Sequence, residues 1–449
     1  MTPNEPNNEI NGHGSQAETA CENEAETALG NAAEKIENST VRDESDVKKS
    51  PLGRHGRTFR LRTLIISCVS CALAGALLVL IFVPNSLRLW VRGNTALDKL
   101  SALDAIIKKN YIYADQIDDE QLADTLAWGY VYGLGDKYSA YYDAEQYTAL
   151  KYSNAGQTYG IGVTVVLYEE RGGIYVVSVT NGSPAEAAGM QKGDLITAVE
   201  GTAVTAENYS QLVADIHGEL GTAVKLTLLR GGETIDMSVM RGEYISNSVT
   251  GEMLGETGYI EISTFNETTA TQFNDVLDSQ IAQGAKSLII DLRGNTGGLV
   301  SAASSVLDRL LPECDLAYAV YNDGSRQVLA TSDSDCVDLP IAVLTDGNSA
   351  SSSEYVASAL RDIAGAKLVG STTYGKGIMQ STYPLGDGSA VRVTVAEIYS
   401  AAGNRYHGTG LAPDIEAGYT AEQQRIWFLL EGKDDPFIAA AIEALSESL

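Results

Sequence analysis

The stretch Ser287-Leu288-Ile289-Ile290-Asp291-Leu292-Arg293-Gly294-Asn295-Thr296-Gly297-Gly298 decides the fold. Its first half is a short apolar run of the kind that forms a buried strand, and its second half is a glycine-rich turn. Apolar residues then recur at helical spacing over residues 299–311. A strand, a turn and a helix in this order indicate an α/β unit.

The same alternation continues on both sides of this stretch, so residues 244–419 are predicted to form an α/β core. The other elements expected in this core are strands at 259–262, 342–344 and 390–396 and helices at 270–285 and 351–363. Residues 420–449 contain many helix formers, and we expect them to be a helical segment that covers the core.

A serine cluster, Asn348-Ser349-Ala350-Ser351-Ser352-Ser353-Glu354, lies where a strand is expected to pass into a helix. Unpaired N–H groups at a helix start favour developing negative charge, so Ser351 is a candidate nucleophile. None of the four histidines is placed as an obvious base, but Lys376 follows Ser351 by 25 positions. A lysine accepts a proton when desolvation or a nearby charge keeps its amine neutral. A Ser351/Lys376 dyad is therefore the working hypothesis.

Each member of this site also has an ordinary alternative. A serine at a helix start is often only an N-cap, and a loop lysine is usually solvated. Gln380 lies four positions after Lys376, so on a regular strand it would share a face with the lysine and orient its amine. Glu354 is interpreted as a first-turn helix acid rather than a base. The backbone N–H of Ser352 and the glycine-rich loop at Gly297 and Gly298 are the candidate oxyanion donors.

Residues 158–243 have a different sequence pattern, with short β-rich runs separated by glycine. They contain Gly182-Ser183-Pro184-Ala185-Glu186-Ala187-Ala188-Gly189-Met190-Gln191-Lys192-Gly193-Asp194-Leu195-Ile196, which resembles the PDZ family. The resemblance implies that Tyr159-Gly160-Ile161-Gly162-Val163 binds a peptide's carboxylate. Glycines let consecutive N–H groups converge on an anion, and the next strand offers an edge to an extended peptide. Taken alone, a Gly-x-Gly pair before a strand is an ordinary turn.

The order of motifs resembles the carboxyl-terminal processing peptidases from about Leu97 to Tyr419. The motifs are Gly258-Tyr259-Ile260, the Asp291–Gly298 loop, the serine cluster, Gly375-Lys376-Gly377-x-x-Gln380, and Gly408-x-Gly410-Leu411-x-Pro413-Asp414-Ile415. The resemblance implies a crotonase/ClpP-like peptidase core that carries an inserted PDZ domain and uses no cofactor. Its substrates would be proteins or peptides with free C-termini.

Residue by residue, the resemblance implies that Ser351 is the nucleophile, Lys376 the general base and Gln380 the residue that positions the lysine. It assigns the oxyanion donors to Gly297 or Gly298 and to Ser352. The family usually has alanine at the position of Ser352, so this chain departs from the pattern inside the site itself.

Residues 64–83 run for 20 positions without a charge or a proline, about the length that crosses ~30 Å of hydrocarbon as a helix. We interpret them as a transmembrane signal anchor; a cleaved signal peptide and a buried core helix are the alternatives. Basic residues are more numerous before the span than after it, which predicts a cytoplasmic N-terminus and an extracytoplasmic catalytic domain in the cell membrane. The tail at 1–63 is expected to be disordered, and residues 94–157 to form a helical entry region.

The net charge of -28 argues against nucleic acid as a partner, because phosphate binding requires a basic surface. Cys314 and Cys336 both fall in the expected extracytoplasmic part, where they either form a disulfide or remain buried free thiols. No HExxH motif occurs, and no metal site is proposed.

Three functions remain in view from the sequence. The first is a membrane-anchored serine endopeptidase that recognises protein C-termini through its PDZ domain. The second is a non-catalytic, membrane-tethered PDZ adaptor, and the third is a crotonase-type acyl enzyme that acts on a thioester. The sequence leaves open the physiological substrate and whether the protein is a homo-oligomer.

Overall fold

The computed structural model describes residues 95–446. The expected tail at 1–63 and the expected membrane span at 64–83 lie outside the described residues. Within residues 95–446, no helix is both long enough and apolar enough to cross a bilayer. Of the described residues, 95–126 belong to one unit and 127–446 to another.

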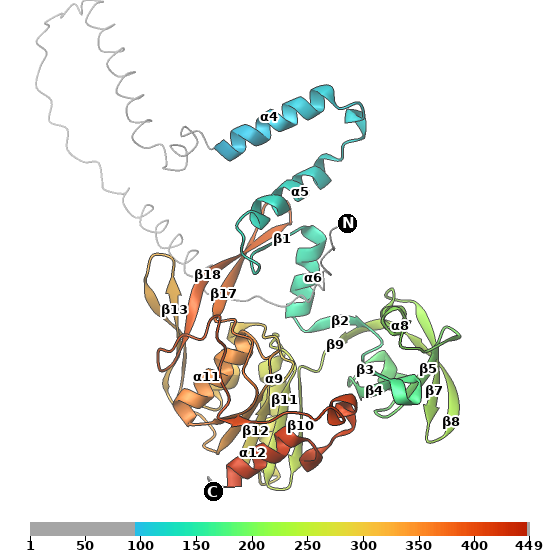
Figure 1. Ribbon diagram of the computed structural model, residues 1–449, viewed down its shortest axis with the longest axis vertical. Helices are drawn as coiled ribbons and strands as arrows, with labels where there is room; N and C mark the ends of the chain where they lie inside the picture. The colour runs from blue at the N-terminus through green and yellow to red at the C-terminus, as the bar shows by residue number, and fades with distance from the viewer. Residues whose placement is uncertain (1–94, 447–449) are drawn as a thin grey trace, which may run out of the picture. The chain divides into compact units, whose positions relative to one another are not determined.

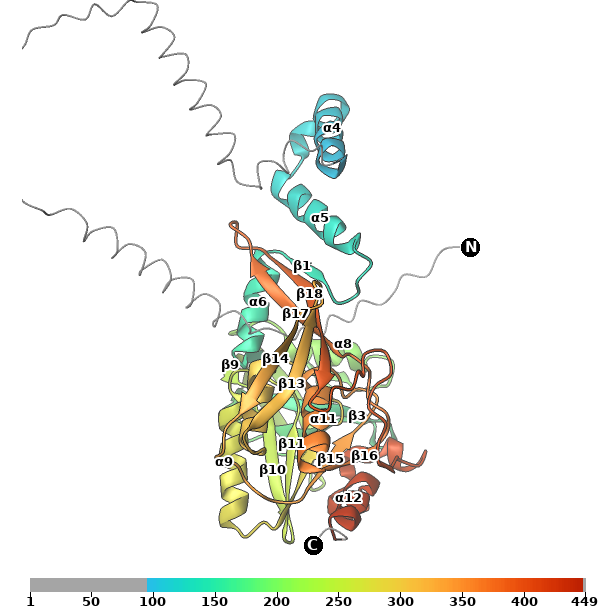
Figure 2. The same ribbon diagram turned by 90° about the vertical axis from the view of Figure 1, so that its left-hand side faces the viewer.

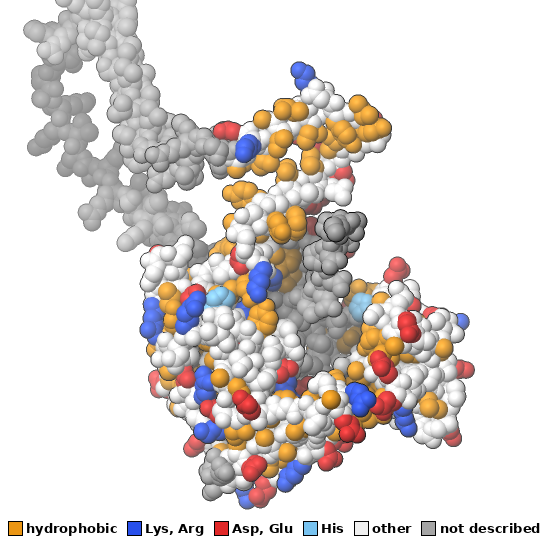
Figure 3. Space-filling model, in the orientation of Figure 1, with side chains coloured by type: hydrophobic (Ala, Val, Ile, Leu, Met, Phe, Trp, Pro, Cys, Tyr) orange, Lys and Arg blue, Asp and Glu red, His pale blue; other side chains and the backbone are white. Residues whose placement is uncertain are grey.

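The first unit contributes helix α4 (Thr95–Asn110), the short helix η1 (Ala114–Gln116) and the start of α5 (Asp119–Tyr132). The helix expected at the start of the entry region is confirmed by α4. An ion pair between Asp104 and Lys108, one turn apart, lies on this helix at 3.1 Å. The apolar side chains of the helical repeat are nevertheless exposed, as Figure 3 shows along α4. These side chains are Leu97, Leu103, Ile106 and Ile107.

The remainder of the entry region begins with strand β1 (Ala140–Tyr142) and helix α6 (Ala144–Asn154). Asp143 caps α6, since its carboxylate accepts a hydrogen bond from the Gln146 N–H at 2.8 Å and the Gln146 side chain accepts one from the Asp143 N–H. Strand β2 (Gln157–Gly160) then pairs antiparallel with β9 (Gly242–Ile245). These two strands lead into and out of the region expected to be PDZ-like.

That region is an antiparallel sheet around a small apolar core, in the order β3-β4-β5-β7-β8, with β6 paired to β5. Its strands are β3 (Val163–Tyr168), β4 (Gly173–Val179), β5 (Leu195–Val199), β6 (Thr202–Ala203), β7 (Ala223–Arg230) and β8 (Glu233–Met240). Its helices are η2 (Glu169–Arg171), α7 (Pro184–Ala187) and α8 (Tyr209–His217). Because β3 lies at one end of this order, one of its edges is not paired within this sheet.

The core of the second unit is a six-stranded sheet, and Figure 1 shows its strands β10, β11 and β12 side by side. Its order is β10 (Val249–Leu254), β11 (Thr257–Ile262), β12 (Ser287–Asp291), β15 (Ile341–Thr345), β16 (Lys367–Gly370) and β19 (Ile415–Glu416). Only β10 runs antiparallel to its neighbour. The predicted α/β core is confirmed.

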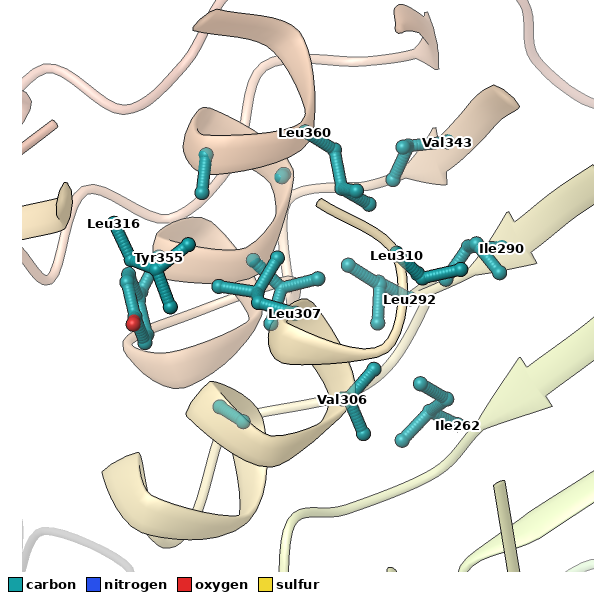
Figure 4. Close-up of a cluster of buried hydrophobic side chains, with 14 of the residues drawn as sticks. Ile262, Ile290, Leu292, Val306, Leu307, Leu310, Leu316, Val343, Tyr355 and Leu360 are labelled. Carbon is teal, nitrogen blue, oxygen red and sulfur yellow. The ribbon is translucent and has the colours of Figure 1, made fainter. Parts of the chain in front are cut away.

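Helices cover both faces of this sheet, which explains why its central strands are apolar throughout. One apolar cluster packs Ile290 and Val343 against α9 (Thr269–Ala282), α10 (Val300–Asp308) and α11 (Ser352–Ala364). Figure 4 shows Leu307 of α10 and Leu360 of α11 together with the strand residues Ile290 and Val343 in this cluster. A second cluster packs Ile289 and Leu344 against α12 (Pro436–Ser446). The short helices before α12 are η3 (Gln423–Arg425), η4 (Trp427–Leu429) and η5 (Gly432–Asp434).

A second sheet was largely missed by the sequence reading. It consists of β13 (Cys314–Tyr321), β14 (Arg326–Ser332), β17 (Ile378–Pro384), β18 (Ala390–Ser400) and β1. Figure 2 shows β13, β14, β17 and β18 side by side. Strand β1 of the entry region pairs with the start of β18, with Ala140 opposite Arg392. The turn before β1 is therefore held close to β17 and β18.

The disulfide considered between Cys314 and Cys336 is not formed, and both thiols are free. The register of the β13–β14 hairpin explains this, because it places Cys314 opposite Ser332. The Cys314 Sγ lies 3.3 Å from the Ser332 Oγ. Cys336 lies beyond the end of β14, where it lines a cavity of about 640 Å³.

Candidate active site

Two loops meet at the carboxyl ends of the adjacent parallel strands β12 and β15, the usual place for a site in an α/β sheet. The Asn295 carbonyl of the first loop accepts hydrogen bonds from the Ala350 N–H at 3.0 Å and from the Ser353 hydroxyl at 2.8 Å. The glycine-rich loop and the serine cluster are thus directly bonded to each other.

Ser351 immediately precedes α11 and has an unusual backbone conformation, with φ 58° and ψ −114°. Among the described non-glycine residues, only Glu200 also has a positive φ. Side chains rarely adopt this conformation, and its cost is characteristic of residues whose position serves a function.

The other three serines of the cluster donate their hydroxyl hydrogens to backbone carbonyls of the glycine-rich loop. Ser349 donates to Leu292 at 2.7 Å, Ser352 to Gly298 at 2.8 Å, and Ser353 to Asn295. The Ser351 hydroxyl donates no hydrogen bond to the described residues. The three neighbours therefore hold the loop, and Ser351 alone keeps a hydroxyl hydrogen available for transfer.

The two candidate glycines of the loop differ in their hydrogen bonding. The Gly297 N–H donates to the Asn295 Oδ1 at 2.8 Å, so it is already engaged. The N–H groups of Gly298 and Ser352 donate to no acceptor among the described residues. A Cβ on Gly297 would lie only 2.9 Å from the Ser351 Cβ, so this loop reaches its position against Ser351 because it lacks a side chain there.

Lys376 lies in the loop between β16 and β17 and is half-buried. Burial lowers its pKa to about 8, and the charge of Arg392 acts in the same direction. Asp136 and Glu354 oppose this shift, while Lys137 adds to it. No described hydrogen bond joins the Lys376 amine to the Ser351 hydroxyl. The lowered pKa nevertheless increases the neutral fraction of the amine near physiological pH, and a base requires this neutral form.

Glu354 is completely buried, and its carboxylate joins the two candidate catalytic segments. One oxygen, Oε2, accepts hydrogen bonds from the backbone N–H groups of Ser351 at 3.0 Å and Lys376 at 2.7 Å. The other, Oε1, accepts from the Gly375 N–H at 2.7 Å and the Thr373 hydroxyl at 2.5 Å. Glu354 does lie in the first turn of α11, but the sequence reading missed its role as a bridge. The Ser-x-x-Glu capping spacing was the available signal.

No hydrogen bond between Gln380 and Lys376 is found among the described residues. Strand β17 begins at Ile378, after the lysine, so the alternation of side chains along a regular strand does not apply to this pair. The Gln380 amide instead donates to the Thr394 Oγ1 at 3.4 Å, and the Thr394 hydroxyl donates to Asp136 at 2.7 Å.

Arg293 ties the glycine-rich loop to the C-terminal segment. Its guanidinium forms ion pairs with Asp291 at 2.5 Å and Asp435 at 2.9 Å, and it donates to the Tyr419 hydroxyl. All three partners lie outside the reacting groups, so the role of Arg293 is to fix the loop that carries Gly297 and Gly298.

The candidate peptide site is the turn between β2 and β3. The carbonyls of Ile161 and Gly162 accept hydrogen bonds from Ala185 and Thr180, whereas their N–H groups donate to no described acceptor. Gly162 has φ +81°, and a Cβ there would lie 2.3 Å from the Ser183 Cβ. Tyr159 precedes the turn, and its ring packs against His217 with 4.7 Å between centroids. Val163 begins β3, whose edge is not paired within its sheet.

Neither a cofactor nor a metal was expected at this site. Among residues 95–446, no group of three or more His, Cys, Asp and Glu side chains is arranged to hold a metal ion.

Comparisons with known proteins match both halves of the second unit. The sequence profile of peptidase family S41 matches residues 256–417, and that of the PDZ domain matches residues 160–240. The carboxy-terminal processing protease CtpA of Bacillus subtilis (strain 168) is 35% identical over 364 residues, which cover 80% of this chain and 77% of that protein. A "Probable CtpA-like serine protease" of Staphylococcus aureus (strain COL) is 31% identical over 322 residues, 71% of this chain and 64% of that protein.

A solved structure gives the same fold. A protein from Bacteroides fragilis NCTC 9343 that is assigned to the S41 proteases superposes with a TM-score of 0.54 and 18% sequence identity. The match covers 77% of this chain and 97% of that one. At this level of identity the likeness concerns the fold alone.

Proposed function

The chain belongs to the CtpA-like carboxy-terminal processing proteases of peptidase family S41 and is a serine-type peptidase, and on this premise we propose that Ser351 and Lys376 form its catalytic dyad. The observation that carries the proposal is the Glu354 carboxylate, which accepts hydrogen bonds from the backbone N–H groups of both residues. A strained serine and a half-buried lysine are thus held by one buried group.

In the proposed mechanism, the neutral amine of Lys376 takes the proton of the Ser351 hydroxyl as its oxygen attacks the scissile carbonyl carbon. The hydrogen bond between the two side chains, which is not formed in the free enzyme, would close as substrate enters. The N–H groups of Gly298 and Ser352 would stabilise the negative oxygen of the tetrahedral intermediate.

The ammonium of Lys376 then gives its proton to the leaving amine, and the peptide bond breaks to leave an acyl ester on Ser351. Water attacks this ester while Lys376 accepts a proton from it. The bond between the acyl carbon and the Ser351 oxygen then breaks, Lys376 returns its proton to that oxygen, and the second product leaves with a free carboxylate. All proton transfers are thus made by one lysine, so the rate should depend on the fraction of its amine that is neutral.

Substrate capture is assigned to the PDZ domain. The unpartnered N–H groups of Ile161 and Gly162 suit a C-terminal carboxylate, and the open edge of β3 suits an extended peptide that adds as a further strand. The enzyme would then be an endopeptidase that recognises its substrates by their C-terminal residues.

The anchoring of the enzyme is also a proposal. The apolar stretch at 64–83 and the basic residues before it support a single membrane span with an extracytoplasmic catalytic domain. A reporter enzyme that is active only outside the cytoplasm, fused after Leu449, should be active in cells. An inactive reporter, with the fusion protein present at normal levels, would contradict this topology.

The experiment that tests the function compares two peptides of the same sequence, one with a free C-terminal carboxylate and one with a C-terminal amide. The full chain in detergent should cleave the acid faster, while the Ser351→Ala and Lys376→Ala variants should bind it but leave it intact. Cleavage by either variant would exclude the dyad. Equal rates for the acid and the amide would remove carboxylate capture from the mechanism.

A further inference from the structure

A turn of the entry region, Asp136-Lys137-Tyr138-Ser139, lies against the loop that carries Lys376. The Lys376 Nζ lies 5.0 Å from the centroid of the Tyr138 ring, and the Lys137 Nζ lies 4.8 Å from the same centroid. The Lys137 ammonium also donates a hydrogen bond to the Tyr374 hydroxyl at 3.0 Å. Tyr374 is two residues before Lys376, so Lys137 bonds directly to the loop of the candidate base.

The turn is fixed in this place by the sheet. Asp136 accepts hydrogen bonds from the Ser139 hydroxyl at 2.6 Å and from the Thr394 hydroxyl of β18 at 2.7 Å. The Ser139 hydroxyl in turn accepts one from the Thr394 N–H at 3.2 Å, and β1 begins immediately afterwards. Lys137 is therefore held beside the site by its neighbours, although its own side chain is exposed.

Lys376 is faced by charged groups from three elements. Arg392 of β18 and Lys137 of the turn are cations and lower the pKa of Lys376, whereas Asp136 of the turn and Glu354 of α11 raise it. Tyr138 and Tyr374 are the ionisable hydroxyl groups that lie next to the two lysines.

We infer that Lys137 is a positioning residue of the reaction, whose ammonium favours the neutral form of the nearby Lys376 amine. The inference rests on the proposed role of Lys376 as general base. Lys137 and Lys376, which both lie beside the Tyr138 ring, then have different roles. One remains a cation, and the other is the proton acceptor.

The environment of Lys137 favours its charged form. Hydrogen bonding to Tyr374 raises the pKa of Lys137, so this group stays charged over the whole range in which Lys376 titrates. A second positive charge near an amine makes protonation of that amine less favourable. Because Lys137 lies at the rim of the site and is exposed, its removal should leave the fold intact.

The test is the pH dependence of kcat/KM for the full chain and its Lys137→Met variant, measured between about pH 6 and pH 10. In the wild type, kcat/KM should rise with pH as Lys376 loses its proton, and this rise is the rising limb of the profile. In the variant the limb should lie about 0.3–0.5 pH unit higher, so activity at lower pH is reduced. This shift corresponds to a rate about two- to threefold lower on the limb and to equal rates at the alkaline plateau. Lys137→Glu should move the limb further in the same direction, and Lys137→Arg should leave it in place.

Lys151→Met is the matched control, because Lys151 also lies over a tyrosine ring, 4.6 Å from the centroid of Tyr147, but does not face Lys376. The control should keep the wild-type limb. A Lys137→Met limb that coincides with the control, or a rate reduced equally at every pH, would overturn the inference. Loss of cleavage at every pH in Lys376→Ala, measured in parallel, reports on the dyad itself, so failure of the inference and failure of the proposed function are told apart.

Discussion

The Glu354 carboxylate accepts a hydrogen bond from the backbone N–H of Lys376 at 2.7 Å. The same oxygen accepts one from the N–H of Ser351, so the loop of the proposed base and the start of the proposed nucleophile's helix meet at one buried atom. Charged acceptors form stronger hydrogen bonds than neutral ones, and burial strengthens them further. Glu354 therefore holds Ser351 and Lys376, which are 25 residues apart in the sequence, in a fixed relative position.

Glu354→Gln should reduce kcat about 10- to 100-fold, because the amide presents an N–H where the carboxylate accepts and the two loops move apart. The variant should also lose about 1–3 kcal/mol of unfolding free energy for its unpaired buried groups. Glu145→Gln, which changes an exposed glutamate in the first turn of α6, is the matched control and should alter neither quantity. Steady-state kinetics and denaturant unfolding of both variants measure these effects. An unchanged kcat in Glu354→Gln would show that the bridge has no catalytic part.

Lys376→Met should abolish cleavage and stabilise the fold at neutral pH. Because burial lowers the pKa of Lys376 to about 8 from the ordinary 10.5, the charged amine destabilises the folded state. Between these two pH values the unfolded chain binds more protons, so the unfolding free energy of the wild type should rise with pH by about 1–3 kcal/mol.

The methionine variant lacks this titration, and its advantage should shrink over the same pH window. Denaturant unfolding near pH 7 and pH 10 checks both statements. A variant that is less stable than the wild type at pH 7 would show that burial of the charged Lys376 amine does not destabilise the folded state.

The sequence predicted the α/β core because apolar runs and glycine turns are local features. It predicted the strand at 287–292 and the helix at 351–363 within a residue or two of the observed β12 and α11. The hairpin of β13 and β14 was missed, although the apolar run at residues 316–321 of β13 is a strand signal. The bridge by Glu354 was missed because its partners at 373–376 are remote in sequence.

Gln380 shows the limit of pattern reasoning most directly. Its relation to Lys376 was inferred from a regular strand, but the strand starts only at Ile378. A bulge between Met379 and Gln380 then changes the register against β18. Such backbone irregularities depend on tertiary packing and leave no periodic signal in the sequence.

Gly298→Ala should reduce kcat about 100- to 1000-fold, because it displaces one proposed oxyanion donor. Gly298 has φ +138°, and an added Cβ would lie 2.1 Å from the Phe265 carbonyl oxygen. Gly294→Ala in the same loop is the matched control, since its φ is also positive at +70° but its Cβ would enter open space. The control should lose about 1–2 kcal/mol of stability and little of kcat. Similar kinetics for the two variants would contradict the assignment of Gly298.

Gly162→Ala should weaken binding of peptides with a free C-terminus, because its Cβ would clash with Ser183 and distort the turn that presents the N–H groups. Gly189→Ala, at another glycine of the same domain with positive φ and open space around it, is the control. Calorimetric titration of the acid and amide peptides against both proteins, each carrying Ser351→Ala to prevent cleavage, gives the affinities. Equal loss of acid binding in both variants would place the carboxylate site elsewhere.

The dyad is tested most directly by the rate at which a fluorophosphonate labels the full chain, followed across pH by mass spectrometry of the modified peptide. The account predicts a single adduct on Ser351, a labelling rate that rises through about pH 8, and no labelling of Lys376→Ala. An adduct on Ser349, Ser352 or Ser353, or a rate that is unchanged in Lys376→Ala, would contradict it.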